Sequence, residues 1–109
     1  MTNNPMSRIV QNVIPAENKL WMCPEAAAVV VGLSNECIRK WVRRGCSSYG
    51  YPIRTIAIHQ RRMVDEVDVR VLAATQRQYA LGKGPLPSGR REELRSFAFR
   101  LRAKMELNR

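Results

Sequence analysis

The chain is short of the residues from which catalytic and metal sites are built. It has one histidine, His59, and three cysteines, Cys23, Cys37 and Cys46, none of which forms a Cys-x-x-Cys pair. A zinc site is therefore poorly supported, and small buried thiols in a reducing compartment are the better interpretation. Clustered carboxylates and a nucleophile elbow are missing too, and the Gly-x-Gly at Gly82 lies between expected helices rather than after a strand. We expect neither an enzyme nor a metal or other cofactor.

Long hydrophobic runs are also missing. No stretch approaches the roughly 18 apolar residues that would cross a bilayer. No Lys-rich amphipathic stretch carries the aromatic anchors of a helix bound at a membrane surface. Residues 1–15 lack the apolar centre of a signal peptide. We therefore expect a cytoplasmic protein that does not bind membranes.

Acidic residues are scarce relative to basic ones. The 109 residues, enough for one small domain with tails, include 19 Lys and Arg against 9 Asp and Glu, which gives a net charge of +10. Such an imbalance favours a polyanionic partner. Because arginine predominates over lysine and makes bidentate contacts to phosphate and guanine, nucleic acid is the leading candidate.

The stretch from Pro24 to Gly45 has the pattern of two short helices joined by a tight turn. Residues 24–31 are small and apolar, with Pro24 at the first helical position, and Gly32 ends this helix. Ser34 is a good N-cap for a second helix, which ends at Gly45. Two helices joined by a short turn that contains glycine form the helix-turn-helix pattern.

The second of these helices has two different faces. Ile38, Trp41 and Val42 recur at the i, i+3, i+4 spacing of one apolar stripe, so we expect them in the core. The outer face is basic and carries an amide, as a helix in a DNA major groove requires. The alternative is a solvated face with an i, i+4 ion pair between Glu36 and Lys40. The expected DNA contacts of this segment are Ser34, Asn35, Glu36, Arg39, Lys40, Arg43 and Arg44.

Residues 53–64 predict a β-hairpin. The segment 53–58 alternates, 59–61 form a polar turn, and 62–64 return as a second short strand. A hairpin with a basic tip directly after a helix-turn-helix is commonly called a wing. It would place Arg61 and Arg62 beside the minor groove or the phosphates, although hairpin tips are polar in many proteins.

A third helix is expected to close the core over the first two. Asp65 is a suitable N-cap, and Asp68 resembles its capping partner. The helix runs from Glu66 to about Leu81. A short strand at 19–22 leads into the first helix. The inward-facing residues of the third helix are Val67, Val71, Leu72 and Thr75.

The chain divides where its composition changes. The Gly- and Pro-rich segment 82–89 is a linker. The segment 1–18 has no net charge, contains two prolines and several asparagines, and is expected to be a mostly flexible arm. Between them lies the expected DNA-binding domain, 19–81, and a C-terminal helix occupies 90–109.

The C-terminal helix is amphipathic. Its apolar residues share one stripe, and the remaining residues are mostly charged. Such a stripe is expected to be buried against its own domain, against another copy of the chain or against a different protein. The residues expected to bind a partner are Leu94, Phe97, Leu101 and Met105.

Residues 23–45 and 60–69 resemble the excisionase family of recombination directionality factors, which has a MerR-like winged helix-turn-helix domain. The family pattern begins Thr-Pro-x-Glu-Ala-Ala-x-x-Leu-Gly-Val-Ser and ends Trp-aliphatic-Arg-x-Gly. The chain follows it without a gap, from Cys-Pro-Glu-Ala-Ala-Ala-Val-Val-Val-Gly-Leu-Ser to Trp-Val-Arg-Arg-Gly. The chain departs from the family where Cys23 and Cys37 replace threonine, where Gln60 replaces a glycine of the wing, and in a longer loop after Gly45.

The resemblance implies a mainly α fold with a small β-hairpin wing, to which this chain adds the C-terminal amphipathic helix. It matches Glu36 and Lys40 to the outward recognition positions of phage excisionases. It also matches Arg39 to a DNA-facing basic position and Arg61 to the wing arginine. It implies DNA binding by both the helix and the wing.

We therefore expect an architectural protein, an excisionase that binds and bends attachment-site DNA and so promotes excision of a phage or integrative element by an integrase. It would act in the nucleoid of a bacterial or phage-infected cell. Its expected partners are double-stranded DNA, a site-specific integrase and further copies of the chain that bind cooperatively. A MerR-like transcriptional regulator is the first alternative, and a non-catalytic phage assembly or packaging adaptor is the second.

Overall fold

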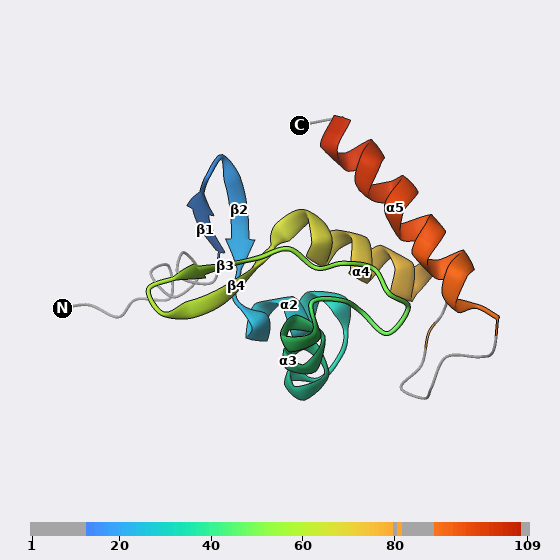
Figure 1. Ribbon diagram of the computed structural model, residues 1–109, viewed down its shortest axis with the longest axis horizontal. Coiled ribbons are helices and arrows are strands. Elements are labelled where there is room, and N and C mark those ends of the chain that lie inside the picture. The colour runs from blue at the N-terminus through green and yellow to red at the C-terminus, as the bar shows by residue number, and fades with distance from the viewer. Residues whose placement is uncertain (1–12, 80, 82–88, 108–109) are drawn as a thin grey trace.

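The described part of the protein is a small α/β fold in which a four-stranded antiparallel sheet lies to one side of the helices (Figure 1). A computed structural model describes residues 13–79, 81 and 89–107. The strands and helices follow one another as β1 Val13–Ala16, β2 Lys19–Met22, α2 Pro24–Val31, α3 Asn35–Arg44, β3 Thr55–Ile58, β4 Arg61–Asp65, α4 Glu66–Gln78 and α5 Arg91–Leu107.

The sheet consists of two hairpins that meet side by side, in the strand order β1-β2-β4-β3. Each hairpin closes through two non-glycine residues with positive φ, Glu17 and Asn18 in the first and His59 and Gln60 in the second. This conformation matches the twist of two-residue hairpin turns. Strands β2 and β4 join the hairpins through a short antiparallel pairing that includes Trp21 opposite Asp65.

The sheet is larger than the sequence predicted. The strand at 19–22 and the hairpin around 59–60 are confirmed, but Val13–Ala16 was expected to belong to a flexible arm and instead forms β1. The indole N–H of Trp21 donates to the carbonyl of Ala16 at 2.9 Å, and this bond fastens β1 across the turn. The rest of the predicted arm, 1–12, lies outside the described residues, as does 82–88 of the predicted linker.

Helices α2 and α3 begin and end where the sequence predicted. Gly32 takes a φ of 84° and ends α2, and Gly45 takes a φ of 81° and ends α3, because glycine adopts this left-handed conformation without a steric penalty. The Ser34 hydroxyl accepts a hydrogen bond of 3.1 Å from the backbone N–H of Cys37 and so caps α3. Cys23 occupies the N-cap position of α2 without a side-chain cap.

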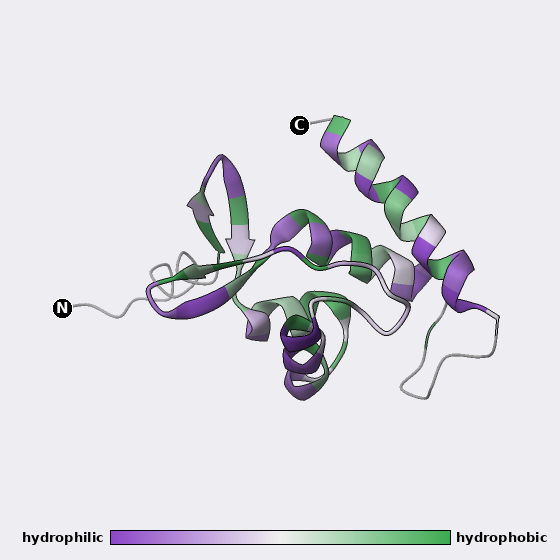
Figure 2. Ribbon diagram, in the orientation of Figure 1, coloured by the Kyte–Doolittle hydropathy of each residue, from purple (hydrophilic) through white to green (hydrophobic). Residues whose placement is uncertain are grey.

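The main core lies between α2, α3, α4 and α5. Ile38, Trp41 and Val42 of α3 are buried in it, as their spacing predicted. All four residues predicted to face inward from α4 are buried as well. In Figure 2 the residues of α3 are coloured mostly as hydrophilic, whereas those of the neighbouring α2 are mostly hydrophobic. Tyr49 and Tyr51, in the loop after α3, are completely buried, although the sequence placed them in an ordinary loop.

Helix α5 packs against the protein's own core. Leu94 and Ala98 are completely buried, and Leu101 and Met105 pack against the same core from its edge. The Phe97 ring meets the Tyr79 ring edge-on, at 5.4 Å between centroids. Of the three surfaces against which the apolar stripe was expected to pack, the structure therefore shows the chain's own domain. The four residues predicted to bind a partner make intramolecular contacts, and Phe97, Leu101 and Met105 remain partly exposed.

Candidate nucleic-acid interface

The nine residues predicted to contact DNA are all exposed. Seven belong to α3 or its N-cap, and the remaining two, Arg61 and Arg62, begin β4 directly after the hairpin turn. Burial of the Ile38, Trp41 and Val42 stripe fixes which side of α3 faces solvent. The exposed residues of the helix and its cap are Ser34, Asn35, Glu36, Arg39, Lys40, Arg43 and Arg44.

The fold brings α3 and the β3–β4 hairpin together around one hollow of about 330 Å³. Arg39 and Arg43 reach it from α3, and Arg61 and Arg62 reach it from β4. These residues are about 20 positions apart along the chain, so only the folded structure unites them. Pro24, Glu25 and Val42 complete the lining. We call this feature the α3–β4 hollow.

One carboxylate connects the two basic elements, and the sequence reasoning missed it. Glu25 lies in the first turn of α2. Its Oε1 is 3.4 Å from Arg39 Nη2, and its Oε2 is 2.9 Å from Arg61 Nη2. From the sequence, an acidic residue at this position signals only a favourable interaction with the helix dipole. Its pairing with Arg61 spans 36 positions and depends on the tertiary fold.

The electrostatics of the hollow keep Glu25 ionised. A hydrogen bond from its own backbone N–H holds the pKa of the Glu25 carboxyl below its ordinary value. Burial opposes this lowering of the pKa, and the Arg61 charge and hydrogen bonds involving Cys23 and Arg39 add to it. At neutral pH the hollow therefore contains one carboxylate among four guanidinium groups.

Within the described residues, the other cations of this surface have no acidic partner. No ion pair joins Lys40, Arg43, Arg44 or Arg62 to a carboxylate within the described part of the chain. The Glu36–Lys40 ion pair, which was the alternative to DNA contact, is not formed in the described part of the chain either. Arg39 and Arg61 do have a partner, yet their side chains remain 58% and 52% exposed. The surface is thus cationic and open to an anion.

The residues that the sequence assigned to the turn and the helix cap have mixed outcomes. His59 is an exposed turn residue, as expected. Asp65 caps α4 by accepting a 2.8 Å hydrogen bond from the Val67 N–H, which confirms that prediction. Asp68, however, is not a capping partner, because its buried carboxylate accepts hydrogen bonds from the Tyr51 hydroxyl and from the backbone and side chain of Arg54. The three cysteines range from buried Cys23 to partly buried Cys37 and Cys46.

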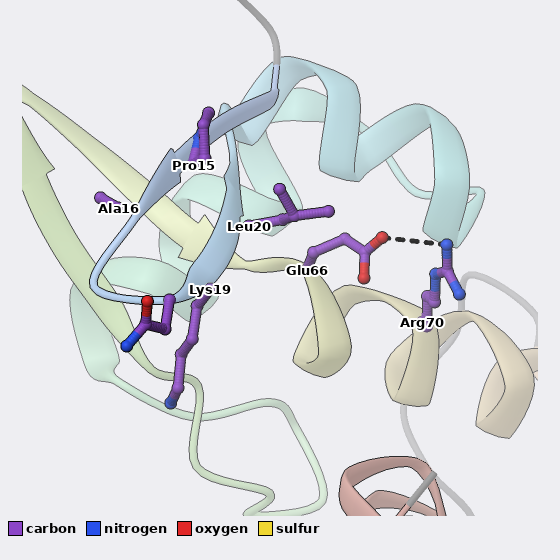
Figure 3. A pocket seen from close by; sticks show the side chains of 7 residues that line it. Pro15, Ala16, Lys19, Leu20, Glu66 and Arg70 are labelled. Atoms are coloured by element: carbon purple, nitrogen blue, oxygen red, sulfur yellow. Dashed lines mark ion pairs between the residues drawn. The ribbon is translucent and has the colours of Figure 1, made fainter. Parts of the chain in front are cut away.

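A second, larger hollow of about 730 Å³ lies between the β1–β2 hairpin and α4 (Figure 3). Its charges are paired: Arg70 lies 2.9 Å from Glu66, and Lys19 lies 3.4 Å from Asp65. Leu20 and Pro15 supply part of its apolar lining. This hollow does not gather unpaired cations as the α3–β4 hollow does, so we do not assign the anion site to it.

In the ranges 13–79 and 89–107, no helix is long and apolar enough to cross a membrane. In the same ranges, no three His, Cys, Asp or Glu side chains gather in a way that could hold a metal ion.

Comparison of the chain with models of protein families, with curated proteins and with solved structures finds no match. What the chain does must therefore be argued from its own residues and from the surface they form.

Proposed function

We propose that this chain is a winged helix-turn-helix protein of the excisionase type, which binds and bends attachment-site DNA. In this proposal α2 and α3 form the helix-turn-helix and the β3–β4 hairpin is the wing. The observation that carries the proposal is the α3–β4 hollow, where cations from the helix and from the hairpin share one surface. A duplex lying on that surface would meet both elements at once.

The recognition step follows from the two faces of α3. The buried stripe of Ile38, Trp41 and Val42 holds the helix in place, so binding in a major groove has to order only its outer side chains and not its backbone. Lys40 is suited to donate to guanine, and Glu36 to accept from a cytosine amine. Asn35 supplies the amide that pairs with adenine edges.

The hairpin supplies the second contact. Arg61 and Arg62 stand directly after the turn and are exposed, so they are suited to the phosphates or to a narrow minor groove beside the helix. Contacts on two neighbouring grooves favour a bent duplex. Bending by about 40–90° costs a few kcal/mol and must be offset by extra contacts. A single small module offers few such contacts, which is why we expect several copies to bind side by side.

We do not place the association surface on α5. Leu94 is buried in the chain's own core, Leu101 and Met105 pack against its edge, and Figure 1 shows α5 and α3 on opposite sides of α4. We therefore assign cooperativity to neighbouring copies on the DNA rather than to pairing through α5. An integrase would be recruited by the bent complex.

A gel-shift and bending assay on DNA that flanks the gene tests the proposal. We expect retarded complexes that appear stepwise as copies add, with mobility that depends on where the site lies in the fragment. Lys104→Ala is a matched control, because it removes one exposed cation of α5 outside the proposed interface. Specific binding without bending would favour the transcriptional regulator. Absence of binding at low salt, where phosphate contacts are strongest, would reject both the excisionase and the transcriptional regulator.

A further inference from the structure

Glu25 occupies an unusual position for an acidic residue in a basic surface. Its two oxygens each contact a different arginine, Arg39 of α3 at 3.4 Å and Arg61 of β4 at 2.9 Å. The side chain of Glu25 is 42% exposed. Ion pairs between exposed side chains contribute little to stability, so these two contacts are readily exchanged for other partners. The arrangement therefore orders both guanidinium groups without locking them.

The walls of the hollow favour an anion that is stronger than one carboxylate. Arg43 and Arg62 line the same space and have no acidic partner in the described part of the chain. Four guanidinium groups against one carboxylate leave an excess of three positive charges. Arginine binds phosphate oxygens in the same bidentate geometry in which it binds carboxylate. A phosphodiester could thus take the place of the Glu25 carboxylate on the same two side chains.

We propose that the α3–β4 hollow seats one backbone phosphate of bound duplex DNA and that Glu25 is the phosphate's intramolecular competitor. In the free protein the Glu25 carboxylate occupies the position that the phosphate will take and holds Arg39 and Arg61 on either side of it. On binding, the phosphate displaces the carboxylate from both. Glu25 then sets the sequence-independent part of the affinity, while base discrimination is left to the outer residues of α3. This inference rests on the proposed function and adds the ligand and the competing residue to it.

Three variants of the full chain separate competition from simple loss of charge. In anisotropy titrations with a short labelled duplex of arbitrary sequence, we expect Glu25→Gln to bind about three- to tenfold more tightly than the wild type, because two exposed ion pairs no longer oppose binding. Glu25→Asp keeps the charge but is one methylene shorter and cannot reach both arginines, so it should also bind more tightly. Glu93→Gln is the matched control, since Glu93 is an exposed carboxylate that pairs with Arg90 on α5 at 3.3 Å, and it should bind as the wild type does.

A double-mutant cycle tests the shared arginine directly. Arg61→Gln should lower the affinity for DNA more in the Glu25→Gln background than in the wild type. In the wild type, the phosphate must break the Arg61–Glu25 ion pair in order to bind. Loss of Arg61 removes that cost and so offsets part of the lost contact. Arg62→Gln, which alters a neighbouring arginine without an ion pair to Glu25, should cost the same in both backgrounds. Thermal melts of each variant establish that the fold is retained.

The outcomes distinguish this inference from the function on which it rests. A wild-type chain that does not bind duplex DNA overturns the proposed function and this inference together. Only the inference is overturned if the wild type binds DNA, Glu25→Asp binds with the same affinity, and Arg61→Gln lowers the affinity equally in the wild-type and Glu25→Gln backgrounds. Tighter binding by both Glu25 variants, with unequal Arg61 costs, supports it.

Discussion

Arg54 Nη1 lies 2.8 Å from Glu106 Oε1, and this ion pair joins the loop before β3 to the last turn of α5. The same guanidinium lies 3.1 Å from Asp68 and 3.4 Å from Asp65, both completely buried at the start of α4. One arginine thus links three elements. Helix α5 is held near its start by the buried Leu94 and near its end by this ion pair.

The Arg54–Glu106 pair predicts a pH-dependent loosening of the end of α5. The hydrogen bond from Arg54 holds the pKa of Glu106 below its ordinary value of 4.5. A carboxyl group with a lowered folded-state pKa stabilises the fold above its ordinary pKa, and this contribution is lost as the pH falls through the lower folded value. We expect the hydrogen-exchange protection of 101–107 to fall in this acidic range, relative to the core of α4.

The substitution Glu106→Gln should reproduce this loosening at neutral pH. The pair is partly exposed, so the expected loss is under about 1 kcal/mol and confined to the last turns of α5. Glu93→Gln removes an exposed carboxylate from the first turns of the same helix and should leave protection at 101–107 unchanged. Equal protection in both variants would show that apolar packing alone holds the end of α5.

Asp68 is expected to be the most sensitive charged residue for stability. Its side chain is completely buried and accepts hydrogen bonds from Tyr51 and from the backbone N–H of Arg54, the latter at 2.8 Å. Asp68→Ala leaves these donors without an acceptor, which costs about 3–5 kcal/mol when a buried pair loses one member. Urea unfolding measures the loss. Glu92→Gln, whose side chain is 83% exposed, is the comparison and should change stability little.

The helices of the proposed interface were predictable because their signals are local. Gly32, Ser34 and Gly45 set the ends of α2 and α3 through backbone conformation and capping, which need no tertiary contacts. The apolar stripe of α3 then fixed which side chains face outward. The exposure of the seven candidate residues on α3 and its N-cap followed from these two facts.

The features that sequence reasoning missed depend on contacts between distant segments. Strand β1 contains Pro15 and only four residues, so it has little strand signal of its own and forms by pairing with β2. Glu25 looks like a helix-dipole residue until the fold brings Arg61 beside it. The stripe of α5 predicted burial correctly, but periodicity does not identify the partner, and the partner is the chain's own core.

The β3–β4 turn offers a stabilising substitution. Gln60 takes a φ of 65°, a left-handed conformation that is unfavourable for residues with a Cβ. Gln60→Gly should remove this strain and raise stability by about 0.5–1 kcal/mol, after allowance for the greater freedom of glycine in the unfolded chain. Gln60→Ala truncates the side chain but keeps the Cβ, so it should give no such gain. Thermal melts of the two variants against the wild type make the comparison, and a larger gain from alanine would contradict the assigned turn.

The proposed interface predicts two different kinds of binding defect. Lys40→Ala removes a side chain placed to reach base edges, so it should reduce discrimination between sites in a base-substitution scan, by about 1–3 kcal/mol at the affected position. Arg62→Ala removes a phosphate contact, so it should weaken binding to all sequences about equally and lower the slope of log affinity against log salt by about 1.

Lys104→Ala, which removes an exposed cation of α5, controls for the loss of one positive charge and should change neither quantity appreciably. The contrast between the first two variants is what the geometry requires, because Lys40 projects from the middle of α3 whereas Arg62 lines the α3–β4 hollow. An unchanged base preference in Lys40→Ala would mean that α3 does not read the groove. A change of base preference in Arg62→Ala would instead place the hairpin, rather than the helix, against the bases.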